Sequence, residues 1–123
     1  MALDNVILND GQSTPVAHTF SYLSQDKGRV IRTDLSRTPD LPLTLTTGHK
    51  FGKVSGFDID SHLQRIDNSI VDADGITILR ANIRVMADVP RRIYSDSLAD
   101  DLAAFIRNWA TSANVRAWLR GAV

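Results

Sequence analysis

The stretch HLQRIDNSIVDADGITILRANIRVMADV, residues 62–89, largely decides how this chain folds. Apolar and polar residues alternate along 62–73 and again along 76–89, which is the pattern of half-buried β-strands. Asp74-Gly75 separates the two runs. An Asp-Gly pair between alternating segments predicts a β-hairpin with a two-residue type I′ turn, because that turn needs a positive φ at both central positions.

A two-residue turn also fixes which residues of the two strands face each other. Ala73 then faces Ile76, and the register of the whole hairpin follows from this pair. One face carries Ile70 opposite Leu79, Asn68 opposite Ala81, Ile66 opposite Ile83 and Gln64 opposite Val85. The other face carries Ser69 opposite Arg80, Asp67 opposite Asn82 and Arg65 opposite Arg84. Like charges that face each other destabilise a sheet. Folding alone therefore does not explain Arg65 opposite Arg84, whereas a polyanion lying across that face would.

Composition sets broad limits on the function. With 123 residues, of which 43% are hydrophobic and 23% charged, the chain is predicted to be one soluble globular domain. It has no cysteine, which excludes disulfides and thiolate metal sites. Fourteen basic residues balance fourteen acidic ones, so net charge does not indicate nucleic-acid binding. A neutral chain can still present a basic face, and arginines concentrate on the predicted strands.

The chain reads as strands first and helices last. The patterns predict an N-terminal hairpin within 1–23 that turns at Asp10-Gly11, followed by strands at 29–35 and 43–46. Glycines at 48, 52 and 56 break up the next stretch, so the strand at 53–57 is only weakly predicted. The long hairpin completes an antiparallel sheet over 29–89. Beyond Pro90 the period changes from 2 to 3.6, which predicts two C-terminal helices over 95–120. The predicted fold class is therefore α+β, in a single domain over 1–123.

The predicted helices carry more apolar surface than one chain can use. Ser95 or Ser97 can cap the first helix, and Thr111-Ser112 separates it from the second. Two short helices cannot cover a whole face of a five-stranded sheet. An intertwined homodimer, in which each helix pair packs over the partner's strands, would cover both surfaces. We predict its interface at Leu98, Leu102, Phe105, Trp109 and Trp118.

The first twenty residues carry a family resemblance. Leu8-Asn9-Asp10-Gly11-Gln12, followed by Thr14-Pro15-Val16-Ala17-His18-Thr19-Phe20, resembles the N-terminal hairpin of many single-stranded RNA bacteriophage (levivirus-like) coat proteins. The order of elements is similar over the full length. The resemblance implies an interlocked dimer with a continuous ten-stranded sheet, helices on the outside of the particle, and a sheet that faces the genome.

The same resemblance implies a function. Such dimers build an icosahedral shell around viral RNA, so the expected location is the virion, assembled in the cytoplasm of the bacterial host. The inner sheet face often binds an RNA stem-loop and represses replicase translation. None of the family's RNA-contacting positions can be matched to this chain residue by residue, so none is carried over.

The residues themselves offer a candidate RNA surface, which we call the arginine face. It consists of Arg65, Arg80, Asn82 and Arg84, extended by Thr44 and Thr46 if their strand joins the same sheet. Arginine makes multidentate contacts to phosphate, and asparagine can bond base edges. The alternative is a solvated outer face with Asp67 as a diagonal partner of Arg65 or Arg80. Arg32, Lys50 and Lys53 are interpreted as ordinary surface charges.

No catalytic or metal constellation emerges. His18, His49 and His62 are scattered over different elements without HxH or HExxH spacing, so we predict no metal site. His18 is expected to anchor the N-terminal hairpin by a hydrogen bond, and His62 to be a structural histidine on the apolar face. Asp58 and Asp60 more often mark a strand edge or turn than an acid–base pair.

We therefore expect no enzyme, no cofactor, no small-molecule substrate and no membrane partner. Two other functions stay open at this point. One is a non-viral dimeric α+β module that binds a ligand or a protein. A more remote one is a small enzyme that uses His62 with a nearby carboxylate.

Overall fold

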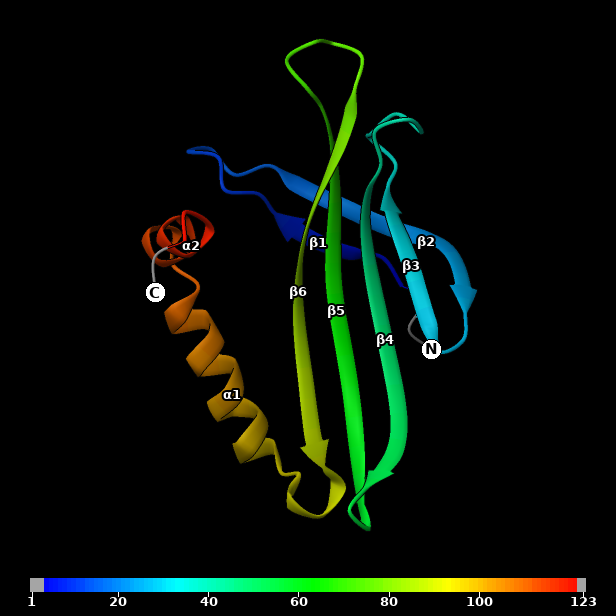
Figure 1. The fold of residues 1–123 in the computed structure, drawn as a ribbon, viewed down its shortest axis with the longest axis vertical. Helices are drawn as coiled ribbons and strands as arrows, with labels where there is room; N and C mark the ends of the chain where they lie inside the picture. Colours follow the sequence, from blue (N-terminus) through cyan, green and yellow to red (C-terminus); the bar gives the residue numbers. More distant parts are fainter. Residues whose placement is uncertain (1–3, 122–123) are drawn as a thin grey trace.

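The computed structural model describes residues 4–121 and contains one sheet followed by helices (Figure 1). Six antiparallel strands form a meander in the order β1 to β6. They are β1 (Val6–Asn9), β2 (Ala17–Asp26), β3 (Arg29–Asp34), β4 (Leu43–Val54), β5 (Phe57–Val71) and β6 (Ile78–Pro90). The helical part consists of the 3-10 turn η1 (Arg91–Ile93), α1 (Asp96–Trp109) and α2 (Ser112–Leu119). The α+β class and the order of elements are confirmed.

The β5–β6 hairpin has the register predicted from its alternation. Arg65 pairs with Arg84, and the other predicted pairs between the two strands are all present up to Ile70 with Leu79. The predicted two-residue turn is wrong. β5 ends two residues before the predicted position and β6 begins two residues after it, so residues 72–77 form a longer loop. In this loop only Gly75 has a left-handed φ, of 73°.

The side chain of Asp74 explains why the tight turn does not form. Its carboxylate accepts hydrogen bonds from the backbone N–H groups of Ile76 and Thr77, both at 2.8 Å, and from the Thr77 hydroxyl at 2.6 Å. Asp side chains compete in this way with regular backbone pairing. The backbone N–H of Gly75 donates to the carbonyl of Asp72 at 2.9 Å. The loop is thus closed by local bonds, while the strands keep their alignment.

Two type I′ turns occur elsewhere, at Lys27-Gly28 and Ser55-Gly56. Both residues of each pair have positive φ values, 48° and 77° in the first and 52° and 83° in the second. They join β2 to β3 and β4 to β5 directly. The predicted interruption of the chain at its glycines, with a weak strand at 53–57, is therefore wrong. Gly48 and Gly52 lie inside β4, paired across to β5.

The N-terminal hairpin crosses one face of the sheet. β2 changes register between Tyr22 and Ser24, a bulge of the kind that bends a strand. Figure 1 shows β1 and β2 running obliquely behind the long strands. The buried apolar side chains come from this crossing: Phe20, Leu43 and Leu45, with Val6 and Ile66 packed against them. The hairpin therefore covers the face of Leu45, and the arginine face lies on the other side.

The helices begin and end where local chemistry places them. The Ser95 hydroxyl accepts from the N–H of Leu98 at 3.0 Å, so Ser95 rather than Ser97 caps α1. Thr111 caps α2 in the same way. Neither helix has a buried residue, and α1 runs alongside β6 at the edge of the sheet (Figure 1). Within residues 4–121, no helix has the length and apolar content that a membrane crossing needs.

Candidate nucleic-acid interface

Three neighbouring strands bring the predicted surface together. Residues that face each other across strands share a side of the sheet, as do residues two apart along a strand. One row contains Thr46, Arg65 and Arg84; the next contains Thr44, Asp67 and Asn82; Arg80 lies in the third, opposite Ser69. The arginine face is therefore one continuous surface, and the condition set for Thr44 and Thr46 is met. Its role in binding RNA stays a prediction.

The residues of the arginine face differ in how exposed they are and in whether their side chains already bond to another residue. Arg65 donates through Nε to Oδ2 of Asp67 at 3.0 Å, with the two side chains 28% and 16% exposed. This is one of the diagonal ion pairs expected for an ordinary solvated face. Arg80 and Arg84 are exposed and make no ion pair or side-chain hydrogen bond within the part of the chain that the structure describes. Thr46 is only 2% exposed, so its hydroxyl offers little accessible surface.

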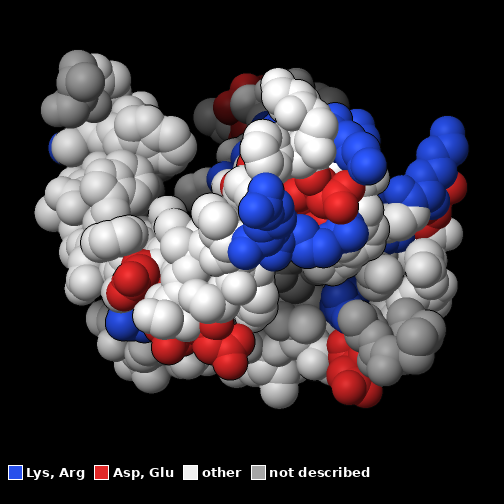
Figure 2. All heavy atoms as spheres, turned by 90° about the horizontal axis from the view of Figure 1, so that it is seen from below, with Lys and Arg blue, Asp and Glu red and all other residues white. Residues whose placement is uncertain are grey.

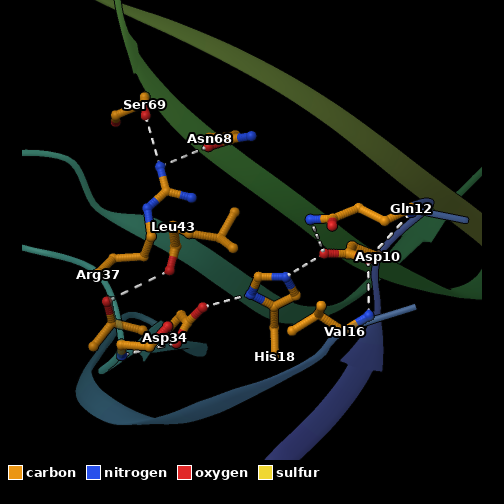
Figure 3. A network of polar contacts seen from close by, with 11 residues as sticks. Asp10, Gln12, Val16, His18, Asp34, Arg37, Leu43, Asn68 and Ser69 are labelled. Carbon is orange, nitrogen blue, oxygen red and sulfur yellow. Dashed lines mark hydrogen bonds and ion pairs between the residues drawn. The ribbon is translucent and has the colours of Figure 1, made fainter. Parts of the chain in front are cut away.

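His18 lies between two carboxylates, one in the turn of its own N-terminal hairpin and one on β3 (Figure 3). Its Nδ1 lies 2.7 Å from Oδ2 of Asp34, and its Nε2 lies 3.0 Å from Oδ2 of Asp10. An ionised carboxylate only accepts hydrogen bonds, so both ring nitrogens donate to their carboxylates when the imidazole is protonated. We call these three residues the His18 bridge. The predicted anchoring role of His18 is confirmed.

Each member of the His18 bridge has a shifted pKa. The pKa of His18 is raised, first by the hydrogen bond to Asp34 and then by the one to Asp10. The pKa of Asp10 is lowered by the backbone N–H of Val16 and then by His18. For Asp34, burial acts to raise the pKa, but the bonds from His18 and Ser36 together outweigh it and the pKa is lowered. The charged form of every member is therefore favoured.

Two further arginines near the bridge have structural roles that the sequence did not indicate. Arg37 Nη2 donates to Oδ1 of Asn68 at 3.1 Å and to the carbonyl of Ser69 at 2.8 Å, which ties the β3–β4 connection to β5 (Figure 3). Arg32 is only 4% exposed and donates through Nε to the carbonyl of Asp4. The interpretation of Arg32 as a surface charge is therefore wrong.

The other two histidines lie together. His49 and His62 face each other across β4 and β5, with their Nδ1 atoms 2.8 Å apart. The three histidines lie on three different strands, as expected, but His49 and His62 meet across two of them. One ring donates to the other, so both Nδ1 atoms have a hydrogen-bond partner. Among residues 4–121, no group of three or more histidines and carboxylates is arranged to hold a metal ion.

The end of the molecule around the β4–β5 turn and η1 is an ion-pair network. Arg91 lies 2.8 Å from Asp60 and 3.6 Å from Asp58, and Lys53 lies 4.0 Å from Asp58. Figure 2 shows cationic side chains grouped around carboxylates at this end. The hydrogen bond from Arg91 lowers the pKa of Asp60. Both carboxylates serve structure here, and Lys53 is a paired surface charge.

Comparison with known proteins places this arrangement in a known fold. No protein-family model matches the sequence, nor does any curated protein. Solved structures do match. The virus-like particle of bacteriophage NT-214 is 19% identical over 98% of this chain and 96% of that chain, with a TM-score of 0.72. For Beihai levi-like virus 21 the identity is 12%, the coverage 97% and 94%, and the TM-score 0.77.

A third match, the virus-like particle of bacteriophage AVE019, is 16% identical, covers 100% of this chain and 98% of that chain, and has a TM-score of 0.71. At such low identities the likeness is one of fold. The chain has the fold of the coat proteins that form levi-like phage particles, and its strands and helices account for nearly the whole of those chains. The predicted fold family is confirmed.

Proposed function

We propose that this chain is the coat protein of a single-stranded RNA bacteriophage, a homodimer that assembles into an icosahedral shell around genomic RNA. The observation that carries the proposal is the agreement in fold with chains from virus-like particles over nearly their full length. A shared fold does not by itself give a function. Two uncovered surfaces of this chain and its arginine face add support.

The first uncovered surface is the free edge of β6. This strand runs from Ile78 to Pro90 and is paired on one side only, with β5. A long exposed edge with apolar side chains, such as Ile83 and Val85, is a template for pairing with another strand. In the proposed dimer the β6 strands of two copies pair and join their sheets.

The second uncovered surface is the apolar side of the helices. A groove of about 650 Å³ runs between β6 and α1, lined by Val85, Val89, Leu102, Phe105 and Ile106 among others. Exposed apolar surface of this kind marks an interaction site. In the proposed dimer the partner's helices fill this region. The interface predicted from the sequence then places Phe105, Trp109 and Trp118 against the second copy.

The arginine face would line the inside of the shell. Arg80 and Arg84 are exposed and carry no partner charge among the described residues, and Asn82 lies in the row between them. Many weak contacts confined in one shell give strong total binding, which reconciles a net charge of zero with RNA packaging. Binding of one RNA stem-loop with repression of replicase translation, and assembly in the host cytoplasm, belong to the same proposal.

Expression of the full chain tests the proposal directly. Size-exclusion chromatography and negative-stain microscopy should show particles of uniform size that contain RNA. A small dimer that binds a ligand and never forms particles would favour a non-viral α+β module instead. A stable monomer would contradict both the shell and the dimer.

A further inference from the structure

A second group of cations lies beside the arginine face, at the β2–β3 turn. Lys27, Arg29 and Lys50 line a hollow of about 260 Å³. Gly48 and the apolar side chains of Leu63 and Met86 also line it, together with Ser61, His49 and His62. The cations therefore surround a concave surface rather than pointing separately into solvent.

The hollow depends on two glycines. A Cβ atom on Gly48 would lie 3.2 Å from Cγ of Arg29, so any larger residue at this position would push the Arg29 side chain a few tenths of an ångström away from β4. A Cβ atom on Gly28 would lie 3.1 Å from the carbonyl oxygen of His49. The N–H of His49 donates to the carbonyl of Gly28 at 3.3 Å. The type I′ turn is thereby held tightly against β4, with Lys27 over the hollow.

The three cations have no internal counter-charge. Within residues 4–121, Lys27, Arg29 and Lys50 make no ion pair or side-chain hydrogen bond. Asp26 pairs with Arg29 through the backbone but forms no ion pair within 4.0 Å. By contrast, Arg65, Lys53 and Arg91 are each bonded to a carboxylate. Converging like charges destabilise the folded chain, and a bound anion would offset that repulsion.

The hollow is continuous with the arginine face. Leu63 precedes Arg65 by two residues on β5, and Met86 follows Arg84 by two residues on β6, so all four lie on the same side of the sheet. Two residues of strand correspond to about 7 Å. A polyanion bound at Arg80 and Arg84 therefore reaches Lys50 and Arg29 without leaving the sheet.

We propose that the hollow formed by Lys27, Arg29 and Lys50 is a subsite for a phosphodiester group of single-stranded RNA. This proposal rests on the proposed function, and it extends the RNA-binding surface beyond the residues expected from the sequence. The Arg29 guanidinium can bond two phosphate oxygens at once, and the two lysines act as point charges beside it. Lys50, interpreted from the sequence as an ordinary surface charge, then becomes part of the site.

The test is the salt dependence of RNA binding by the full-length protein before it assembles into particles. A fluorescent single-stranded RNA oligonucleotide is titrated against wild type and against Lys27→Gln/Lys50→Gln over a series of salt concentrations. Each phosphate contact on a single strand contributes about 0.7 to the slope of log K against log salt, so the double variant should lower the slope by about 1.4. Glutamine keeps the length of the side chain and removes only the charge.

Lys53→Gln is the matched control, because Lys53 is paired with Asp58 and points to the other face of β4. It should leave the slope unchanged. An unchanged slope in the double variant, together with a reduced slope in Arg80→Ala/Arg84→Ala, overturns the subsite and leaves the proposed function standing. A wild type that forms particles but binds no RNA overturns both the subsite and the RNA-binding role.

A titration with inorganic phosphate alone distinguishes RNA from free phosphate as the ligand of the hollow. An RNA subsite gives a difference in slope between wild type and double variant with RNA in chloride. If the two proteins differ in their affinity for inorganic phosphate but give the same slope with RNA, the hollow takes free phosphate and the assignment to RNA is overturned.

Discussion

Replacing Phe105 with alanine should weaken the proposed dimer strongly. Phe105 is 68% exposed in the single chain and lines the groove beside β6. A phenylalanine buries roughly 200 Å² when fully covered, so a partner would cover about 140 Å² of it. At ~25 cal/mol per Å², this corresponds to about 3.5 kcal/mol for each copy. Two copies in a symmetric dimer give about 7 kcal/mol, or roughly five powers of ten in the dissociation constant.

The measurement is sedimentation equilibrium combined with urea unfolding at several protein concentrations. A dimer that folds and assembles together has an unfolding midpoint that rises with concentration, and Phe105→Ala should lower that midpoint at every concentration. Leu35→Ala is the matched control, because Leu35 is also exposed but follows β3, which is separated from β6 by two strands. This control should keep the dissociation constant of the wild type.

Two results would refute this reasoning. The first is a Phe105→Ala protein that dimerises as tightly as wild type, which would mean that no partner covers the groove. The second is an equal weakening in Leu35→Ala, which would mean that the loss comes from general destabilisation rather than from the interface.

Three further predictions follow from the structure. Arg80→Ala/Arg84→Ala should lower the slope of log K against log salt for RNA by about 1.4 while the dimer survives, and unchanged filter binding would reject the arginine face. Protection of the β1–β2 amides from hydrogen exchange should be lost as the pH rises through the pKa of His18, which is raised above 6.5, since its bonds stabilise the fold fully only below that ordinary value. It should also be lost as the pH falls through the pKa values of Asp10 and Asp34, which are lowered from 3.8, and a protection that stays constant above pH 6.5 would contradict the His18 bridge. Leu45→Ala should cost about 2–5 kcal/mol of unfolding free energy in urea, because Leu45 is fully buried; a loss far smaller than this would mean that the site collapses around the smaller side chain.

The register of β5 and β6 was predictable because an alternation of period 2 allows few alignments that keep one face apolar. The turn was not, because its outcome depends on hydrogen bonds from the Asp74 carboxylate that compete with the type I′ geometry. The real type I′ turns contain Lys27 and Ser55 at positive φ, where asparagine and aspartate are the usual residues. Their sequence signal was therefore weak.

The candidate site was also predictable only in part. The residues on β5 and β6 followed from the alternation alone, and Thr44 and Thr46 needed only that their strand pair with β5. The hollow with Lys27 and Lys50 could not be predicted, because it needs the exact alignment of β2, β3 and β4. Arg32 was misplaced because the group that bonds it, the carbonyl of Asp4, is distant in sequence.

The free edge of β6 has a consequence for how the protein is made. Until a newly synthesised chain meets a sibling, a row of amide and carbonyl groups along that strand remains open to any extended polypeptide. We expect productive folding to favour neighbouring chains on one polysome, where the local concentration is high. Refolding yield should accordingly increase with chain concentration before aggregation sets in, and a yield that is highest at extreme dilution would contradict this expectation.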